Sequence, residues 1–253
     1  MRLHLLLMNL PFFYEKNVDA STCILSEETS KHCVQVLRMK EGEQLQLTNG
    51  KGSLFTATIV DANKKHCSVK IEDTSFKLQD ASDVILSSRN RQPARSNVSI
   101  AISLLKNPSR FEWFSEKATE IGVKEIIPLI CDRTEKENFR FDRMNNILIS
   151  AMLQSKQTWL PQLHQPKKFK DFINEGFDGI KLIAHCIEEE KKSIADLNFS
   201  NQSKLILIGP QGDFSNSEVQ AAIQKNFIPV TLGSTRLRSE TAGIVASALL
   251  CNR

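Results

Sequence analysis

The sequence predicts an α/β domain preceded by a small β-rich domain. Up to about residue 72, short strand-like segments are joined by turn-forming residues. From residue 97 onward, apolar strands alternate with amphipathic helices, a pattern typical of a mainly parallel sheet. We therefore expect residues 1–72 to form a β domain, residues 73–96 a linker, and residues 97–253 the α/β domain.

The β-rich region contains three candidate strands, at Gln44–Thr48, Ser53–Val60 and Cys67–Ile71. Asn49-Gly50-Lys51-Gly52 supplies turn residues for a hairpin between the first two, and residues 61–65 do so for the next pair. Residues 27–37 predict a short helix, and residues 1–8 are interpreted as a first strand rather than a signal peptide. A small β-barrel or a strongly bent sheet would account for this region.

The predicted linker is polar and basic between Ser87 and Ser96 and is interrupted by Pro93. A solvated connector is the plainer interpretation, and contact of its arginines with a polyanion is the alternative. The preceding Val84-Ile85-Leu86 could add a strand.

The α/β region contains five predicted strands, at residues 98–105, 126–130, 180–185, 205–208 and 227–232. Two capping boxes, Ser109 to Glu112 and Ser215 to Glu218, predict helix starts. Gly122 is placed to end the first helix, and residues 145–153 belong to the next. The last helix, residues 241–250, is largely apolar, which indicates burial either in the core or against a second subunit.

Composition limits the classes of function. Hydrophobic residues make up 41% of the chain and charged residues 25%, as in an ordered globular protein. A formal net charge of +4 is compatible with a nucleic-acid partner but too small to indicate one. The six scattered cysteines form no C-x-x-C pair, so we expect reduced thiols in a cytosolic protein and no metal site. No apolar segment is long enough to cross a membrane.

Two loops at strand ends are the candidate functional segments, because ligands of parallel sheets bind where the carboxyl ends of the strands meet. The first is Ile208-Gly-Pro-Gln-Gly-Asp-Phe214, and the second runs from Leu232 to Ala242 with two arginines and a glutamate. The chain contains no G-x-G-x-x-G and no P-loop motif, so a dinucleotide or P-loop site is poorly supported. No serine, cysteine or histidine lies in a recognisable nucleophile motif.

Together the two loops resemble the RsmE family of 16S rRNA uridine-N3 methyltransferases, which belongs to the SPOUT superfamily. The resemblance lies in Gly-Pro-Gln-Gly followed by Leu-Gly…Leu-Arg-Ser-Glu-Thr-Ala, the most specific part. Further matches extend it over nearly the whole chain in the expected order: His32…Val36-Leu37-Arg38 with Gly42, Lys117-Ala-Thr-Glu120-Ile-Gly122-Val123…Pro128, and Gln154-Ser155…Pro161.

The resemblance implies a PUA-like N-terminal β-barrel for RNA binding and a C-terminal SPOUT domain with a deep trefoil knot. It also implies S-adenosylmethionine as cofactor and 16S rRNA, within the small ribosomal subunit, as substrate. Enzymes of this family act as homodimers. A cytoplasmic location is the corresponding expectation.

Site residues follow from the same motifs. The predicted cofactor-binding residues are those of the two loops: Gly209, Pro210, Gln211, Gly212, Leu232, Gly233, Leu237, Thr241 and Ala242. Arg238 would stabilise the uracil anion or position a neighbouring phosphate, and Glu240 would accept the N3 proton or hold Arg238 in place. The alternative is that Arg238 and Glu240 only form an ion pair that fixes the loop. Candidate phosphate contacts in the N-terminal domain are Arg2, Arg38 and Lys40, although a solvated surface explains them nearly as well.

The chain departs from the family pattern at three places. Gln211 and Asp213 stand where the family usually has glutamate and glycine, and Lys156-Gln157 stands where an arginine is usual. Two other functions therefore stay open. One is an RNA-binding protein of the same fold without methyl transfer, and the other is a SPOUT methyltransferase that acts on a ribose 2′-hydroxyl or a tRNA guanine.

Overall fold

The computed structural model describes residues 10–18, 21–73, 96–188, 191–199 and 202–252. The chain divides into two compact units, one of residues 1–93 with 152–160 and the other of residues 94–151 with 161–253. The predicted first strand, the Val84–Leu86 segment and nearly all of the predicted linker lie outside the described residues.

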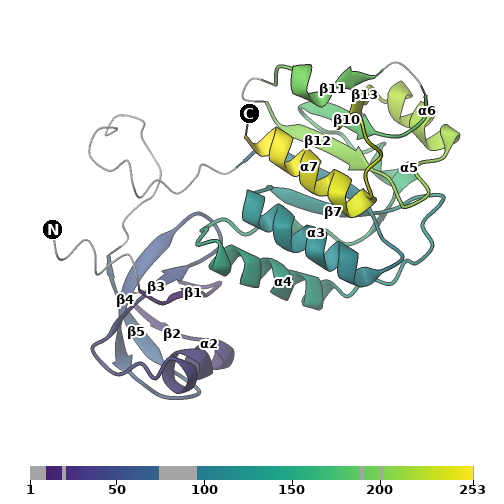
Figure 1. Ribbon diagram of the computed structural model, residues 1–253. Coiled ribbons are helices and arrows are strands. Elements are labelled where there is room, and N and C mark those ends of the chain that lie inside the picture. Colours follow the sequence, from purple (N-terminus) through teal and green to yellow (C-terminus); the bar gives the residue numbers. More distant parts are fainter. Residues whose placement is uncertain (1–9, 19–20, 74–95, 189–190, 200–201, 253) are drawn as a thin grey trace. The chain divides into compact units, whose positions relative to one another are not determined.

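The first unit contains a five-stranded sheet in the order β1-β3-β4-β5-β2 (Figure 1). Its strands are β1 Phe12–Tyr14, β2 Thr22–Ile24, β3 Gln44–Thr48, β4 Leu54–Asp61 and β5 Ser68–Asp73. β1 pairs with β3 in parallel, and the other pairs are antiparallel. The three predicted strands are therefore confirmed, with small shifts at their ends.

The turn between β3 and β4 depends on its glycines. Gly50 and Gly52 have φ values of +70° and +92°, which residues with a Cβ rarely adopt. A Cβ on Gly52 would lie 2.3 Å from the indole ring of Trp159, which packs over the turn. Lys51 and Trp159 also form an isolated β-bridge. The sequence did not predict that the segment around Trp159 would belong to this unit.

The segment predicted as one short helix has two parts. The α-helix α2, Glu27–Lys31, is capped by the Ser26 side chain and continues directly into a π-helical turn over His32–Val36. Inside the unit, alternate side chains of β3, β4 and β5 are buried, as expected for strands with one face on a core: Leu45, Leu47, Ala57, Ile59 and Val69.

The second unit contains an eight-stranded sheet in the order β11-β13-β10-β12-β6-β7-β8, with β9 beside β7. Its strands are β6 Val98–Ser103, β7 Glu125–Ile130, β8 Gln162–Leu163, β9 Lys167–Lys168, β10 Ile180–Ala184, β11 Lys192–Ser193, β12 Lys204–Ile208 and β13 Ile228–Thr231. Every described pair in this sheet is parallel. The predicted parallel sheet is confirmed, and all six residues of β6 are buried at its centre.

The helices of this region are α3 Pro108–Ile121, α4 Phe141–Gln154, α5 Phe169–Phe172, α6 Asn216–Gln224 and α7 Ser239–Cys251, with a 3₁₀ turn at Ile194–Asp196. α3 and α7 lie side by side on one face of the sheet (Figure 1). No helix within the described ranges is both long and apolar enough to cross a membrane.

The observed helix ends agree with two of the three predicted capping positions. The capping box at Ser109 is wrong: Asn107 is the N-cap, and its side chain accepts a hydrogen bond from the Ser109 amide at 3.0 Å. Pro108 explains the shift, since proline fits the first helical position, where its missing N–H is not needed. The box from Ser215 to Glu218 is confirmed, and so is Gly122, which ends α3 in the left-handed conformation at φ +97°.

The apolar helix α7 is buried on one side only. A Cβ on Gly243 would lie 2.6 Å from the Phe114 ring, so this glycine lets α7 approach α3 closely. Gly243, Ala246 and Leu250 are buried, whereas Ile244, Val245, Ala248 and Leu249 on the other side are only partly covered. Core burial thus explains one side of the helix and leaves the other available.

Candidate functional site

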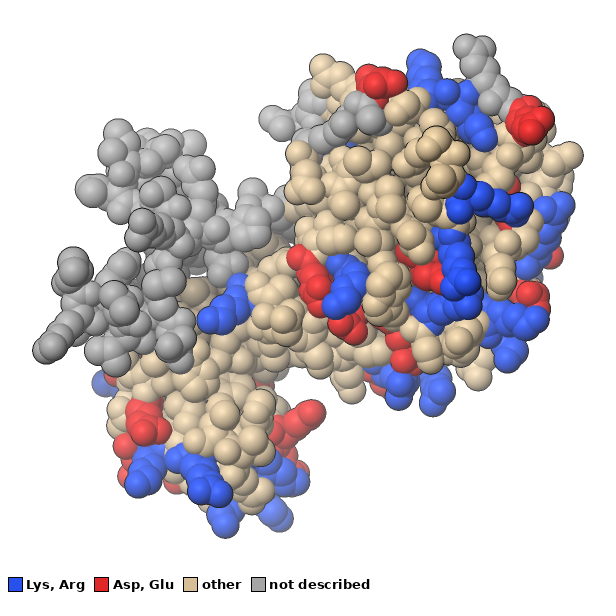
Figure 2. Space-filling model, in the orientation of Figure 1, with Lys and Arg blue, Asp and Glu red and all other residues tan. Residues whose placement is uncertain are grey.

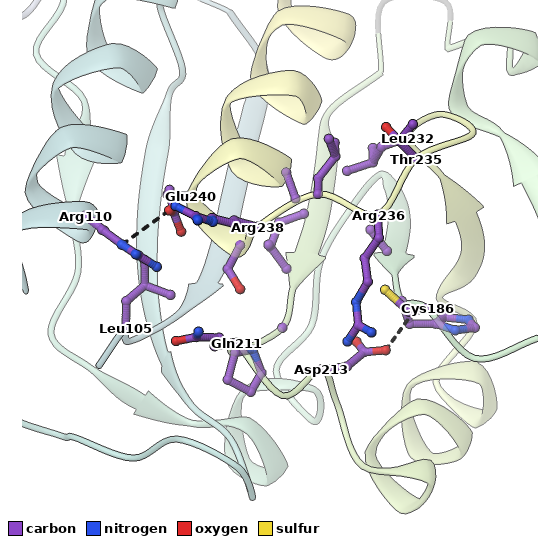
Figure 3. Close-up of a pocket in the computed structure, with 18 of the residues that line it drawn as sticks. Leu105, Arg110, Cys186, Gln211, Asp213, Leu232, Thr235, Arg236, Arg238 and Glu240 are labelled. Carbon is purple, nitrogen blue, oxygen red and sulfur yellow. Dashed lines mark hydrogen bonds and ion pairs between the residues drawn. The ribbon is translucent and has the colours of Figure 1, made fainter. Parts of the chain in front are cut away.

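The two predicted loops meet in one cavity at the carboxyl edge of the parallel sheet. The strand order places β13, β10, β12 and β6 next to one another, so the loops that follow them converge. The cavity has a volume of about 350 Å³. Its walls, shown in Figure 3, come from four segments: Leu105–Arg110, Ala184–Cys186, Ile208–Asp213 and Val230–Ala242.

Most of the predicted cofactor-binding residues line this cavity. Those that do are Gly209, Pro210, Gln211, Leu232, Gly233, Leu237 and Ala242, and the predicted catalytic residues Arg238 and Glu240 also line it. Gly212 and Thr241, both described, are not among the lining residues. Lys156 and Gln157, where the chain also departs from the family pattern, belong to the first unit and do not line the cavity.

The loop after β12 is held by its own core contact and by an arginine. A Cβ on Gly209 would lie 3.1 Å from the ring and the backbone nitrogen of Phe214, which is fully buried. Arg133 donates hydrogen bonds to the carbonyl oxygens of Gly212 at 2.7 Å and Phe214 at 3.3 Å. Gly212 therefore supports the loop from outside the cavity. No local pattern in the sequence indicated Arg133, because this contact joins residues far apart in the chain.

A buried carboxylate fixes the start of α6 behind the same loop. Glu218 closes the capping box by accepting from the Ser215 amide at 2.8 Å. Its other oxygen accepts from the amide of Asp132, which follows β7, at 2.8 Å. The Asp132 carboxylate in turn accepts from the Ser215 hydroxyl at 2.7 Å. The start of α6, which follows the loop after β12, is therefore held to the segment after β7.

The second loop leads directly into α7, whose first residues line the cavity. Arg238 is the N-cap residue of α7 and makes no side-chain capping bond, and the helix begins at Ser239. A helix start carries partial positive charge on its free amides, which favours anions. The Arg238 side chain is exposed, and within the described part of the chain it makes no hydrogen bond or ion pair.

Glu240 is buried and pairs with an arginine that the sequence did not single out. Its Oε1 lies 3.6 Å from Nε of Arg110 on α3 (Figure 3). Among the described residues no ion pair joins Glu240 to Arg238. The alternative that these two form a loop-fixing pair, and the suggestion that Glu240 holds Arg238, are therefore not supported by the geometry.

Positive charge predominates around the cavity. Lys106, Arg110, Arg236 and Arg238 line it, against the acidic Asp213 and Glu240. Lys106 is partly neutralised by Glu135 at 2.7 Å. Figure 2 shows lysine and arginine side chains gathered on the second unit around the start of α7. The arrangement suits a reaction in which negative charge develops.

The two cysteines on or near the cavity loops differ in their environment. Burial, reinforced by the Glu218 carboxylate, raises the pKa of the Cys131 thiol far above its usual range, so this thiol is neutral and a poor nucleophile. Cys186 lines the cavity as an exposed free thiol. Within the described ranges, no cluster of three or more histidine, cysteine, aspartate or glutamate residues could hold a metal ion.

The predicted RNA contacts lie in the first unit. Arg38 and Lys40 are both exposed. Arg38 adopts a left-handed backbone at φ +58°, and the amide of Lys40 donates to the Glu43 carboxylate at 3.0 Å. Arg2 lies outside the described residues.

Family models and relatives agree with this geometry. A model described as an RNA methyltransferase domain matches residues 92–251, and one described as an RNA methyltransferase PUA domain matches residues 25–72. Ribosomal RNA small subunit methyltransferase E of Buchnera aphidicola (subspecies Acyrthosiphon pisum) is 31% identical over 89% of this chain and 86% of its own length. The chain belongs to the RsmE family of RNA methyltransferases.

Solved structures extend the likeness to RsmE folds. A probable rRNA-methyltransferase from Porphyromonas gingivalis has a TM-score of 0.83 and 35% identity, covering 96% of this chain and all of its own. Ribosomal RNA small subunit methyltransferase E of Neisseria gonorrhoeae, bound to S-adenosyl methionine, has a TM-score of 0.79 and 26% identity, covering 95% and 96%. The predicted fold class is confirmed: a PUA-type β domain and a C-terminal domain of the SPOUT trefoil-knot class.

Proposed function

We propose that the protein transfers a methyl group from S-adenosylmethionine to N3 of a uridine in 16S rRNA of the small ribosomal subunit. The observation that carries the proposal is the single cavity into which both motif loops, Gly209–Asp213 and Leu232–Ala242, project. In this proposal residues 1–72 form the RNA-binding domain, and residues 97–253 form the domain that carries the methyl-transfer site. Residues 73–96 are the linker between these two domains.

The cavity residues fit this cofactor. Small-molecule sites usually enclose about 300–1,000 Å³, and the cavity of about 350 Å³ reaches that range. Gly233 would let the ligand approach the backbone, since nothing lies within 4 Å of where its Cβ would be. Leu232 and Leu237 supply apolar walls. S-adenosylmethionine supplies an electrophilic methyl carbon on its sulfonium when it is bound.

The chain itself supplies charge and a proton acceptor. Uridine N3 is a weakly acidic imide that must lose its proton before it attacks, and negative charge then spreads onto the uracil oxygens. Arg238 and the backbone amides at the start of α7 would stabilise that charge. Glu240 would accept the N3 proton, and Arg110 would fix the orientation of its carboxylate.

The proposed partners are 16S rRNA and a second copy of the chain. Exposed Arg38 and Lys40, together with Arg2, are the proposed phosphate contacts. The partly covered side of α7, with Ile244, Val245 and Leu249, is the proposed homodimer interface. All six cysteines are free thiols, which suits the cytoplasmic location that we propose.

RNA affinity is expected to fall steeply with salt. Each phosphate contact releases counterions, so the slope of log affinity against log salt should be about −0.7 to −0.9 per contact. Replacing both Arg38 and Lys40 with alanine should make the slope shallower by about 1.5, measured by filter binding over a salt series. Equal slopes for the wild type and the double variant would remove these residues from the RNA interface.

Calorimetry separates the proposed enzyme from an RNA-binding protein without methyl transfer. The wild-type protein is expected to bind S-adenosylmethionine at one site per chain, with heat that disappears when the cavity is blocked by Gly233→Trp. Tight RNA binding without any cofactor heat would favour the alternative. This test matters because Gln211 and Asp213 depart from the family pattern inside the cavity.

A further inference from the structure

Asp213 occupies a backbone conformation that most residues avoid. Its φ is +63°, in the left-handed region that glycine adopts most easily. Aspartate tolerates this region better than other residues because its short polar side chain can hydrogen-bond to nearby backbone. The residue lines the cavity at the end of the loop after β12.

The Asp213 carboxylate joins two of the cavity loops. One oxygen accepts from the adjacent Phe214 amide at 2.9 Å, within the loop after β12. The other accepts from the amide of Cys186, in the loop after β10, at 2.7 Å. Hydrogen bonds to an ionised carboxylate are stronger than those between neutral groups. A glycine at position 213 could adopt the same backbone but could not make the link to Cys186.

A third loop faces the same carboxylate. Arg236 lies in the exposed part of the loop after β13, and its guanidinium points toward Asp213 across the cavity (Figure 3). The two opposite charges therefore come from the two motif loops that enclose the site. Attraction between these two charges would favour the position of the exposed loop beside the other two loops.

We propose that Asp213 is a positioning residue that clamps the loops after β10, β12 and β13 into the arrangement that binds the cofactor. Preorganised loops lose less conformational entropy when a ligand binds, so the clamp would raise affinity without any contribution to the chemical step. The proposal rests on the proposed function for the identity of the cofactor. The link between the loops after β10 and β12 rests on the hydrogen bonds of Asp213, and the link to the loop after β13 rests on the approach of Arg236.

Amide hydrogen exchange in the absence of cofactor tests the clamp directly. In Asp213→Gly, exchange of the Cys186 amide is expected to be about tenfold faster, because its charged acceptor is lost. Asn226→Gly is the matched control, since Asn226 also has a left-handed backbone, at φ +65°, and does not line the cavity. It should leave exchange at Cys186 unchanged.

Calorimetry with S-adenosylmethionine tests the consequence. Affinity is expected to fall about tenfold in Asp213→Gly, and less in Asp213→Asn, which retains one acceptor oxygen. Arg236→Gln should weaken binding while leaving exchange at Cys186 as in the wild type. Circular dichroism verifies that each variant is folded.

Two results would overturn the clamp: exchange at Cys186 that is unchanged in Asp213→Gly, or cofactor affinity in that variant equal to that of the Asn226→Gly control. A wild-type protein that binds no S-adenosylmethionine would contradict the proposed function instead. In that case the exchange rates alone would decide whether Asp213 holds the loops together.

Discussion

Replacing Arg238 with alanine is expected to lower kcat by about 100- to 1,000-fold, the usual cost of removing one preorganised donor from a developing negative charge. The affinity for S-adenosylmethionine should change by less than about threefold, because the guanidinium acts on the uracil rather than on the cofactor. The reason lies in the geometry: Arg238 borders the cavity at the start of α7 and has no side-chain partner in the described part of the chain. Single-turnover methyl transfer to small subunits, with calorimetry of cofactor binding, measures both quantities.

Arg140→Ala provides the control for this experiment. Arg140 is exposed, precedes α4 and does not line the cavity, so its loss should leave kcat and cofactor affinity near the wild-type values. An Arg238→Ala variant as active as the control would remove Arg238 from the mechanism. A variant that lost cofactor affinity and kept kcat at saturation would assign Arg238 to binding.

Glu240→Gln is expected to lower kcat by about 100-fold or more near neutral pH, since positioned proton transfer contributes about 10²- to 10⁴-fold. Glutamine has nearly the shape of glutamate but cannot accept the N3 proton. As pH rises, a growing share of uridine N3 is deprotonated in solution, so the need for an acceptor declines. The activity gap between the wild type and the variant should therefore narrow with increasing pH, as measured by initial rates over a pH series.

Arg110→Gln distinguishes this role from a structural one. If Glu240 only pairs with Arg110 across the 3.6 Å contact, Glu240→Gln and Arg110→Gln should reduce activity equally. The difference in activity between the wild type and each variant should then be the same at every pH. If Glu240 accepts the proton, Arg110→Gln should have the smaller effect. A pH-independent deficit in Glu240→Gln would exclude the proton-acceptor role.

The sequence predicted those parts of the molecule that depend on local patterns. Short strand-like segments separated by turn residues marked β3 to β5, and the capping box at Ser215 marked α6, because these signals lie within a few residues of the element. The two motif loops were predicted to meet because parallel strands end at one edge. The cap at Asn107 was missed because a serine and a glutamate three residues apart imitated a helix start two residues too late.

The contacts that complete the site could not be predicted in the same way. Arg110 and Glu240 are brought together by the packing of α3 against α7, which only the three-dimensional arrangement of the sheet decides. The same holds for Arg133 at the Gly212 carbonyl and for Asp213 at the Cys186 amide. Each of these two contacts joins residues from different strand-end loops, and no local sequence pattern predicts such a contact.

Nucleoside mass spectrometry of 16S rRNA most directly tests the claim that this cavity methylates a uridine at N3. Small subunits from a strain that lacks the gene should contain no N3-methyluridine at the target. Incubation with the purified protein and S-adenosylmethionine should restore one such nucleoside per 16S rRNA, and the Arg238→Ala variant should restore far less in the same time. The account would be contradicted if the deletion strain kept its N3-methyluridine, or if the restored methyl group lay on a ribose or another base.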